Sequence, residues 1–276
     1  MIELIHVSKS YGTKPAVNDL DLRIGAGELF AFLGPNGAGK TTTIKMLCGL
    51  LFPTSGSIRI AGFDLETQGK EARQHVSYVP DTPFLYEKLT GRELLQFVAD
   101  MYRMPSATAT RRIDEMIALF TLGAFVDDLT QNYSHGMRQR TVFASALLHE
   151  PRVLIVDEPT VGLDPLGIRL LKDVLRNETK RGATVFLSTH SLDVAQELSD
   201  RIGVIHQGRL IGCGNLDELR QRADLNGTLE EVFLKMTDEE KAPAETRFQE
   251  LEPLSPPRER GEGLAPLSPP GERGRG

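Results

Sequence analysis

The sequence has no apolar run long enough to span a bilayer, which takes about 18–20 consecutive apolar residues. Its first residues, Met1-Ile2-Glu3-Leu4, lack the basic and apolar regions with which a signal peptide begins. We therefore expect a cytosolic chain, and we expect any role at a membrane to depend on a partner protein.

Basic residues are not in excess, and cysteine is scarce. The 32 Lys and Arg residues face 38 Asp and Glu residues, which gives a formal net charge of -6. Nucleic-acid binders usually carry excess positive charge, so no nucleic-acid partner is expected. Cys48 and Cys213 form no CxxC pair and have no companion histidine cluster, so both are expected to be reduced packing residues.

What the chain does contain is a glycine-rich loop between a predicted strand and a predicted helix. The apolar run at 29–33 precedes eight residues that fit the pattern G-x-x-x-x-G-K-[ST], and residues 41–47 read as a helix. Glycines let backbone N–H groups approach phosphate oxygens, and a helix N-terminus favours an anion. Lys40 adds a charge for the β- and γ-phosphates, and Thr41 can ligate Mg²⁺. The sequence therefore predicts a nucleoside-triphosphate site at Gly34, Pro35, Asn36, Gly37, Ala38, Gly39, Lys40 and Thr41.

Two carboxylates follow a second buried strand. Residues 153–156 are all apolar, as in a strand covered on both faces of a parallel sheet. Asp157 and Glu158 come next, at the strand end where ligands of open α/β sheets bind. Asp157 would hold Mg²⁺ through water, and Glu158 would accept a proton from the attacking water. His190 follows the strand predicted at 183–188 and would share this edge, although a lone histidine is more often structural.

The rest of the chain predicts an α/β domain with a helical insertion. Alternation at 2–8 and 18–24 indicates antiparallel strands, and further strands are predicted at 57–62 and 75–81. A hairpin at 202–212 and a short helix at 229–234 close the domain. Helical periodicity takes over between about 84 and 150, where Thr90 and Glu93 form a capping box. The predicted apolar face of the helix after Thr90 consists of Leu94, Phe97, Val98, Met101 and Tyr102.

The residues alone allow two interpretations of each of three features. Tyr11 is either a core residue or an exposed ring that stacks on a base. Ser134 is a plausible N-cap, and its helix start beside the small Gly136 is either a second anion site or a plain cap. The Pro- and Gly-rich tail at 237–276 carries a duplicated 13-residue repeat and is expected to be disordered. It is either a PxxP docking segment or a dispensable repeat extension.

Taken in order, these motifs resemble those of the ATP-binding cassette (ABC) ATPases over residues 1 to about 236. The resemblance implies an α/β fold with a mostly parallel P-loop NTPase core, an N-terminal antiparallel β subdomain and an inserted α-helical signature subdomain. Residues 34–42 match the Walker A loop, which adds Thr42 to the site, and residues 153–158 match the Walker B strand. The resemblance also makes Tyr11 the adenine-stacking aromatic, Asp164 part of the D-loop and His190 the switch histidine that contacts the γ-phosphate.

The chain departs from the family pattern at two places. In the signature loop, His135 and Met137 replace the usual Gly and Gln, while Ser134 and Gly136, the γ-phosphate contacts, are kept. Asp81 stands where the family usually has Gln, and an ionised carboxylate there can approach Mg²⁺ through water but donates no hydrogen bond. These variants look most like the bacterial exporter branch, in which a stand-alone ATPase pairs with a separate permease.

The resemblance implies Mg²⁺-dependent hydrolysis of ATP between two cassettes arranged head to tail. The partners would be a second ABC ATPase subunit, which could be another copy of this chain, and a transmembrane permease at the inner face of the membrane. The permease's coupling helices would meet the surface around Asp81 and the helices at 84–125. A soluble ABC ATPase acting on ribosomes or DNA is the alternative; the single cassette and the acidic balance favour the transporter.

Overall fold

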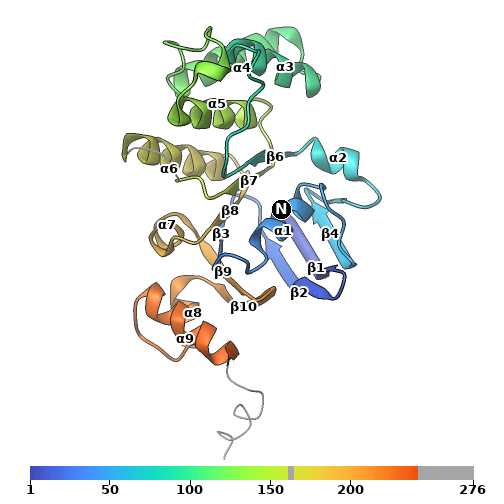
Figure 1. Cartoon of the computed structure of the whole chain (residues 1–276), viewed down its shortest axis with the longest axis vertical. Helices are drawn as coiled ribbons and strands as arrows, with labels where there is room; N and C mark the ends of the chain where they lie inside the picture. Colours follow the sequence, from blue (N-terminus) through green and yellow to red (C-terminus); the bar gives the residue numbers. More distant parts are fainter. Residues whose placement is uncertain (161–164, 242–276) are drawn as a thin grey trace, which may run out of the picture. The chain divides into compact units, whose positions relative to one another are not determined.

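The computed structural model describes residues 1–160 and 165–241, which contain two β-sheets (Figure 1). The first sheet is antiparallel, with the strand order β2-β1-β4-β5. Its strands are β1 (Ile2–Tyr11), β2 (Lys14–Ile24), β4 (Ser55–Ile60) and β5 (Phe63–Asp64). The predicted N-terminal antiparallel subdomain is therefore confirmed.

The second sheet is mostly parallel and has the order β10-β9-β3-β8-β7-β6. All neighbours pair in parallel except β10, which forms an antiparallel hairpin with β9. The strands are β3 (Leu29–Leu33), β6 (Val76–Val79), β7 (Val153–Asp157), β8 (Thr184–Thr189), β9 (Arg201–His206) and β10 (Arg209–Gly214). Both the predicted parallel core and the predicted hairpin are present.

The central strands of the parallel sheet are buried on both faces, as their apolar sequences predict. Successive side chains of a strand point to opposite faces, so each strand supplies two cores. On β8, Phe186 packs with residues of the antiparallel sheet and of the helix after β3. Val185 and Leu187 lie on the other face, in a core that α6 and the helical insertion also line. Because apolar cores pack on both faces, the strands of the parallel sheet and their ends are held in place.

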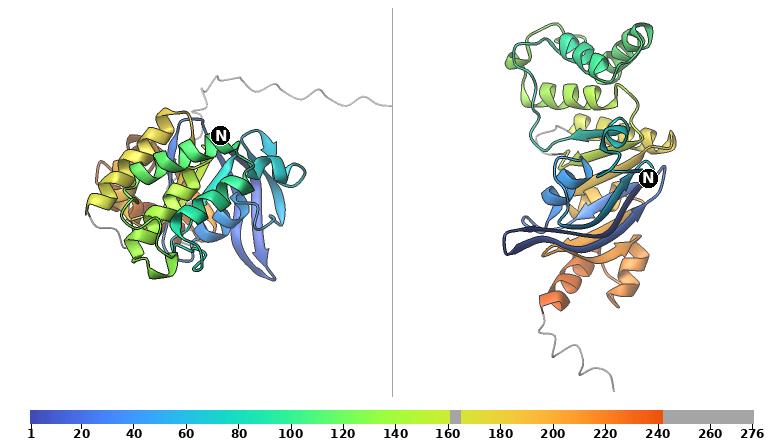
Figure 2. Two further views of the ribbon diagram at one scale, coloured as in Figure 1. Left: turned by 90° about the horizontal axis from the view of Figure 1, so that it is seen from above. Right: turned by 90° about the vertical axis from the view of Figure 1, so that its right-hand side faces the viewer.

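The helical insertion lies between β6 and β7 in the chain and packs beyond the β6 edge of the sheet (Figures 1 and 2). It contains α3 (Gly91–Met101), α4 (Ser106–Leu119), a 3₁₀ turn (Thr130–Asn132) and α5 (His135–Leu147). The other helices are α1 (Lys40–Leu47), α2 (Gly69–Arg73), α6 (Pro165–Lys180), α7 (Leu192–Leu198), α8 (Leu216–Arg222) and α9 (Leu229–Lys241). The predicted inserted helical subdomain is confirmed.

The buried face of α3 differs from the predicted one. The capping box is present, because the Thr90 hydroxyl accepts from the Glu93 N–H and the Glu93 carboxylate accepts from the Thr90 N–H. The buried residues, however, are Leu94, Leu95 and Ala99, whereas Phe97 and Met101 are exposed. Because Leu95 and the small Ala99 pack in the core of the insertion, the larger side chains lie on the outer flank.

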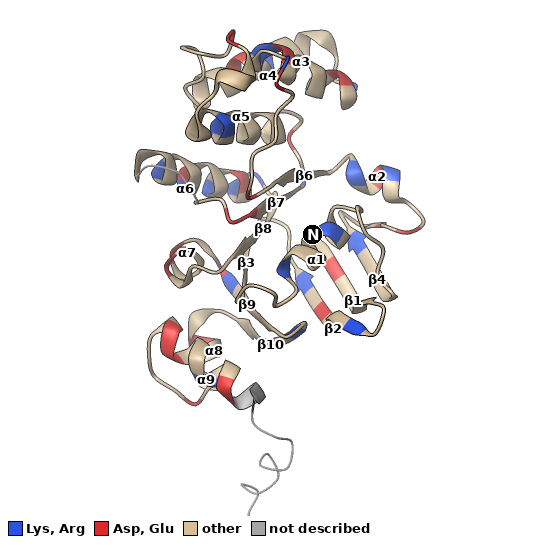
Figure 3. Ribbon diagram, viewed as in Figure 1, with Lys and Arg blue, Asp and Glu red and all other residues tan. Residues whose placement is uncertain are grey.

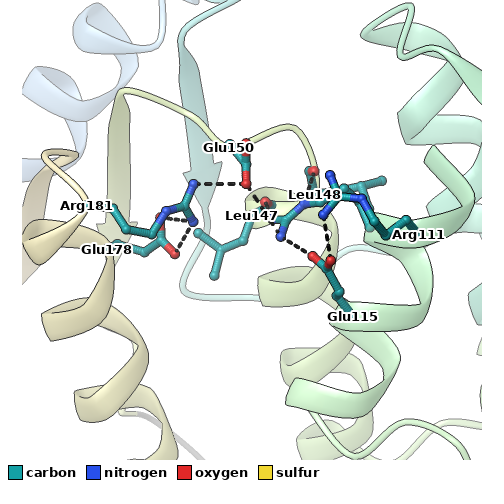
Figure 4. Close-up of polar contacts among 8 residues, drawn as sticks. Arg111, Glu115, Leu147, Leu148, Glu150, Glu178 and Arg181 are labelled. Carbon is teal, nitrogen blue, oxygen red and sulfur yellow. Dashed lines mark hydrogen bonds and ion pairs between the residues drawn. The ribbon is translucent and has the colours of Figure 1, made fainter. Parts of the chain in front are cut away.

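A chain of charged groups joins the helical insertion to α6 (Figure 4). Arg112 of α4, which is only 7% exposed, donates to the carbonyls of Leu147 and Leu148 at the end of α5. Ion pairs then run from α4 through the segment after α5 to the end of α6: Arg112 with Glu115 and Glu150, and Arg181 with Glu150 and Glu178. The insertion is therefore tied to the core by directional contacts as well as by apolar packing.

The C-terminal helix is longer than predicted. The predicted domain boundary at residue 236 falls within α9, which continues to Lys241. Residues 242–276 of the predicted tail and Asp164 of the predicted D-loop lie outside the described residues. Among the residues that the structure describes, no helix has both the length and the apolar character needed to cross a membrane.

Candidate nucleotide site

The carboxyl ends of β3, β7 and β8 bring the predicted site residues to one edge of the parallel sheet. Leu33, the last residue of β3, pairs with Thr189 at the end of β8. Asp157, the last residue of β7, pairs with Ser188. The glycine-rich loop, Glu158 and His190 each begin where one of these strands stops, so they meet at this edge.

The glycine-rich loop at 34–39 needs glycine at two positions for steric reasons. Gly39 immediately precedes α1 with a φ of +113°, and a Cβ on it would lie 2.6 Å from the Ala16 carbonyl oxygen. A Cβ on Gly34 would lie 2.4 Å from the carbonyl oxygen of Ile205. The Gly208 N–H, in the hairpin turn after β9, also donates a hydrogen bond to the Ala38 carbonyl of the loop at 2.8 Å. The loop is thereby held between β2 and β9.

Lys40 begins α1 and lies inside the loop, where it is 7% exposed. Its Nζ donates to the Gly34 carbonyl at 2.5 Å and lies 3.7 Å from Oε1 of Glu158. Burial lowers the pKa of Lys40, and the nearby carboxylates of Glu158 and Asp157 oppose that shift. Thr41 is exposed at the first turn of the helix, so its hydroxyl is open to a ligand.

Glu158 has a strained backbone and a carboxylate held at both oxygens. Its φ is +45°, a left-handed conformation that is uncommon for a residue with a side chain, and its N–H donates to the Ser188 carbonyl at 2.9 Å. Oε1 lies 2.8 Å from Nδ1 of His190. Oε2 accepts a hydrogen bond from the Thr189 hydroxyl at 3.2 Å. The predicted base, the predicted switch histidine and Lys40 are thus brought together.

Asp157 is a buried carboxylate, 6% exposed, beside other negative groups. Burial raises its pKa, and the charges of Asp81 and Glu158 add to the rise, while Lys40 opposes it. Asp81 itself is exposed, and its Oδ1 accepts from the Thr82 N–H at 2.7 Å. The carboxylates of Asp157 and Asp81 and the exposed Thr41 hydroxyl are hard oxygen ligands, the kind that suits Mg²⁺.

Tyr11, at the end of β1, is 53% exposed, which excludes the core alternative for this ring. Nζ of Lys9 lies 5.9 Å from the ring centroid and donates to the Phe52 carbonyl at 2.7 Å. The outer part of the ring is free to stack on a planar group.

Ser134 and Gly136 are not brought to the glycine-rich loop of their own chain. Ser134 caps α5 by accepting from the Met137 N–H at 3.3 Å. Figure 1 shows α5 packed with α3 and α4, whereas α1 lies beside the antiparallel sheet. The residues predicted to contact the γ-phosphate therefore form a second, separate surface.

Two residues of this site escaped the sequence analysis. Thr189 contacts Glu158, and Lys9 lies against Tyr11. Thr189 could have been suspected only from its place beside His190 at a strand end, because its contact depends on the left-handed backbone of Glu158. Lys9 carried no distinguishing pattern.

Residues 17–161 match the family model described as ABC transporter. The chain is 39% identical over 223 residues to the bacitracin transport ATP-binding protein BcrA of Bacillus licheniformis, covering 80% of this chain and 72% of that protein. It is 36% identical over 240 residues to the probable multidrug ABC transporter ATP-binding protein YbhF of Escherichia coli (strain K12). That match covers 86% of this chain and 41% of YbhF, so the chain spans less than half the length of that relative.

Solved structures show the same fold. A structure described as the ATP-binding subunit of an ABC transporter superposes with a TM-score of 0.82 at 35% identity, covering 86% of this chain and 99% of the other. A dimeric ATP-binding cassette in a post-hydrolysis state, bound to ADP and Pi, has a TM-score of 0.70 at 27% identity. It covers 78% of this chain and 99% of its own.

Proposed function

The chain belongs to the ABC transporter family, and we propose that it is the ATP-hydrolysing subunit of an exporter whose permease is a separate polypeptide. Its class of chemistry is ATP hydrolysis, as in other ABC ATPases. The observation that carries the proposal is the cluster of Lys40, Asp157, Glu158 and His190 at one edge of the sheet. A base, a cation and a carboxylate able to hold Mg²⁺, placed around a phosphate loop, are the groups that hydrolysis of a phosphoanhydride uses.

Each group at this edge has a distinct task in the proposed reaction. The loop amides and Lys40 stabilise the phosphate charge, and Tyr11 stacks on the adenine. Glu158 accepts the proton of the attacking water, and His190, 2.8 Å from it, steadies that water and the γ-phosphate. Thr41 would hold Mg²⁺ directly, and Asp157 and Asp81 would hold it through water; when bound, the ion would supply positive charge to the β- and γ-phosphates.

A second copy of the chain completes the site in this proposal. Ser134 and Gly136 lie at the start of α5, in the helical insertion, and apart from the loop that binds the phosphates. The exposed start of this helix offers backbone N–H groups and a hydroxyl to an anion on another molecule. Two chains arranged head to tail would enclose ATP between the loop of one and α5 of the other, and the structurally similar cassette is a dimer.

The surface proposed for the permease is an exposed aromatic patch, formed by Phe84, Tyr86, Phe97 and Met101. These side chains are 76%, 51%, 39% and 67% exposed. The Phe84 and Tyr86 rings meet edge to face at 5.9 Å, as do Tyr86 and Phe97 at 5.4 Å. Contiguous exposed apolar side chains of this kind mark docking surfaces. The patch begins three residues after Asp81 in the sequence, so a partner seated on it would contact the segment that carries Asp81.

Charge distribution supports a protein partner over a nucleic acid. Lys and Arg residues and Asp and Glu residues both occur across the two sheets and the helical insertion (Figure 3). A nucleic-acid surface needs a basic stripe or patch. We place the subunit at the inner face of the cell membrane, held there by the permease.

The chemical part of the proposal is tested by Glu158→Gln. The amide cannot accept the proton, so turnover should fall by at least about a hundredfold, while ATP stays bound and holds the two chains together. Steady-state phosphate release and size-exclusion chromatography with ATP measure the two effects. Glu178→Gln, which changes a buried glutamate near the end of α6, is the matched control and should retain turnover. Near-normal turnover of Glu158→Gln would overturn the assignment of the base.

The partner is tested by affinity purification of the tagged chain from detergent-solubilised cells, followed by mass spectrometry. We expect a polytopic membrane protein in stoichiometric yield, lost when Phe84 and Tyr86 are both replaced by Ser. Recovery of ribosomal or DNA-repair proteins, with the chain absent from membranes, would contradict the transporter role and leave the ATPase chemistry standing.

A further inference from the structure

Thr189 lies at the centre of the sheet edge that holds Lys40, Asp157, Glu158 and His190, which we call the catalytic edge. It is the last residue of β8, it is fully buried, and β8 lies between β3 and β7 in the sheet. Its backbone therefore runs between the end of the strand that feeds the phosphate loop and the end of the strand that precedes Glu158. No other strand end of the sheet adjoins both, among the residues that the structure describes.

Three hydrogen bonds tie this one residue to three parts of the site. The Thr189 hydroxyl donates to Oε2 of Glu158 at 3.2 Å and accepts from the Ser191 N–H at 3.0 Å. The Thr189 carbonyl accepts from the N–H of Gly34, the first residue of the phosphate loop, at 3.4 Å. The base, the loop that carries His190 and the phosphate loop thus share one anchor.

The direction of the hydroxyl proton follows from its partners. A backbone N–H can only donate, so the bond from Ser191 occupies a lone pair of Oγ1. An ionised carboxylate can only accept, so the single hydroxyl proton points to Glu158. Ser191 also caps α7 with its own hydroxyl, which fixes the position of its N–H. The hydroxyl of Thr189 is therefore oriented before any substrate binds.

Glu158 needs this support because its other contacts have different tasks. Lys40 and His190 both approach Oε1, and in the proposed reaction both engage the phosphates of ATP. The contact from Thr189 is to the opposite oxygen, and it involves a neutral group that has no role toward phosphate. The left-handed backbone of Glu158 is itself costly, so it depends on surrounding contacts to hold it.

We propose that Thr189 is a positioning residue: its hydroxyl holds Oε2 of Glu158 so that Oε1 faces the attacking water. This inference rests on the proposed function, in which Glu158 is the base. It assigns a rate effect to a residue that touches neither ATP nor water.

The test is Thr189→Val, which keeps the β-branched shape and removes only the hydroxyl. A hydrogen bond to a charged group contributes enough that its loss should lower kcat about tenfold to a hundredfold. The affinity for a fluorescent ATP analogue should stay within about twofold of wild type, because the loop and Lys40 are unchanged. Thr189→Ser, which restores the donor, should recover kcat to within about threefold.

A matched control separates catalysis from stability. Thr184, at the other end of β8, is equally buried, and its hydroxyl donates to the Gly25 carbonyl at 2.7 Å. Thr184→Val should lower the thermal midpoint about as much as Thr189→Val does and leave kcat unchanged. Equal losses of kcat in the two variants would reduce Thr189 to a structural residue and overturn the proposal.

A double mutant distinguishes failure of this inference from failure of the proposed function. In a Glu158→Gln background, Thr189→Val should cause no further loss of turnover, because the group through which it acts is gone. If Glu158→Gln retains normal turnover, the base assignment itself is wrong. If Glu158→Gln is inactive but Thr189→Val keeps the wild-type kcat, the base assignment stands and only the role of Thr189 is refuted.

Discussion

At the scale of single residues, the catalytic edge holds groups in states that work against folding. Asp157 is a carboxylate with almost no exposure, Lys40 is a buried ammonium, and Glu158 has a left-handed backbone. Each state raises the free energy of the folded chain. Such groups gather at functional sites, where the stability that they cost is exchanged for a prearranged charge distribution.

Asp157→Asn should make the metal-free protein more stable at neutral pH. Burial raises the pKa of Asp157 above its ordinary value of 3.8, so the folded state binds this proton more tightly than the unfolded chain. Stability therefore falls as pH rises from 3.8 to the raised pKa, and above that window the buried charge costs a constant amount. The variant avoids this cost, and its advantage over wild type should vanish as the pH approaches 4.

Calorimetry in EDTA, between pH 4 and 8, measures the effect. The exposed Asp173 of α6 provides the control Asp173→Asn, which should stay within about 0.5 kcal/mol of wild type throughout. Adding Mg²⁺ and ATP should reverse the order and favour wild type. A variant that melts below wild type at pH 7 in EDTA would show that the carboxylate is not under strain.

The sequence predicted individual site residues only where the residue type dictates the chemistry. The glycine-rich loop, Lys40 and the Asp157-Glu158 pair were recognised in this way, and the structure brings them to one edge of the parallel sheet. The contact of Thr189 with Glu158 joins residues 31 positions apart. It follows from strand order and from a left-handed residue, and neither is written in the local sequence.

At the scale of elements, Arg112 holds α4 against the end of α5 within the helical insertion. Its guanidinium bonds two carbonyls at the end of α5 and pairs with Glu115, while being almost fully buried. Arg112→Met would leave those carbonyls without a donor, so we expect a loss of about 3 kcal/mol of stability. Urea unfolding, followed by circular dichroism, measures it.

The neighbouring Arg111 is the control for this prediction. It is largely exposed and pairs with Glu115 at the surface, so Arg111→Met should cost no more than about 0.5 kcal/mol. Equal effects of the two variants would show that the carbonyl bonds of Arg112 contribute nothing beyond a surface ion pair.

The presence of α3 could be predicted from the sequence, but the face that it buries could not. Strong capping and periodicity placed α3 and its N-terminus correctly. The periodic set could not show which of two overlapping stripes would be buried, because Leu94 and Val98 belong to both. Packing selected the stripe with the small Ala99, and the larger Phe97 and Met101 were left for the proposed docking surface.

At the scale of the whole molecule, the groups that we propose for the ATP site lie on two separate parts of the chain. The phosphate loop and the catalytic edge belong to the two-sheet core, and the start of α5 belongs to the helical insertion. Closure of two chains around ATP and opening after hydrolysis would be the two-state change that drives the permease.

The central claim is that each site is shared between two chains, and mixing two inactive variants tests it most directly. Lys40→Ala disables the phosphate loop, and Ser134→Glu places a negative charge toward the γ-phosphate while remaining compatible with a helix N-terminus. Each variant alone should show almost no ATP turnover. A mixed dimer contains one site with both defects and one intact site, so mixing should restore up to about a quarter of wild-type turnover if sites act independently and chains pair at random. Full activity of Ser134→Glu alone, or no recovery in mixed dimers verified by two different tags, would contradict the account.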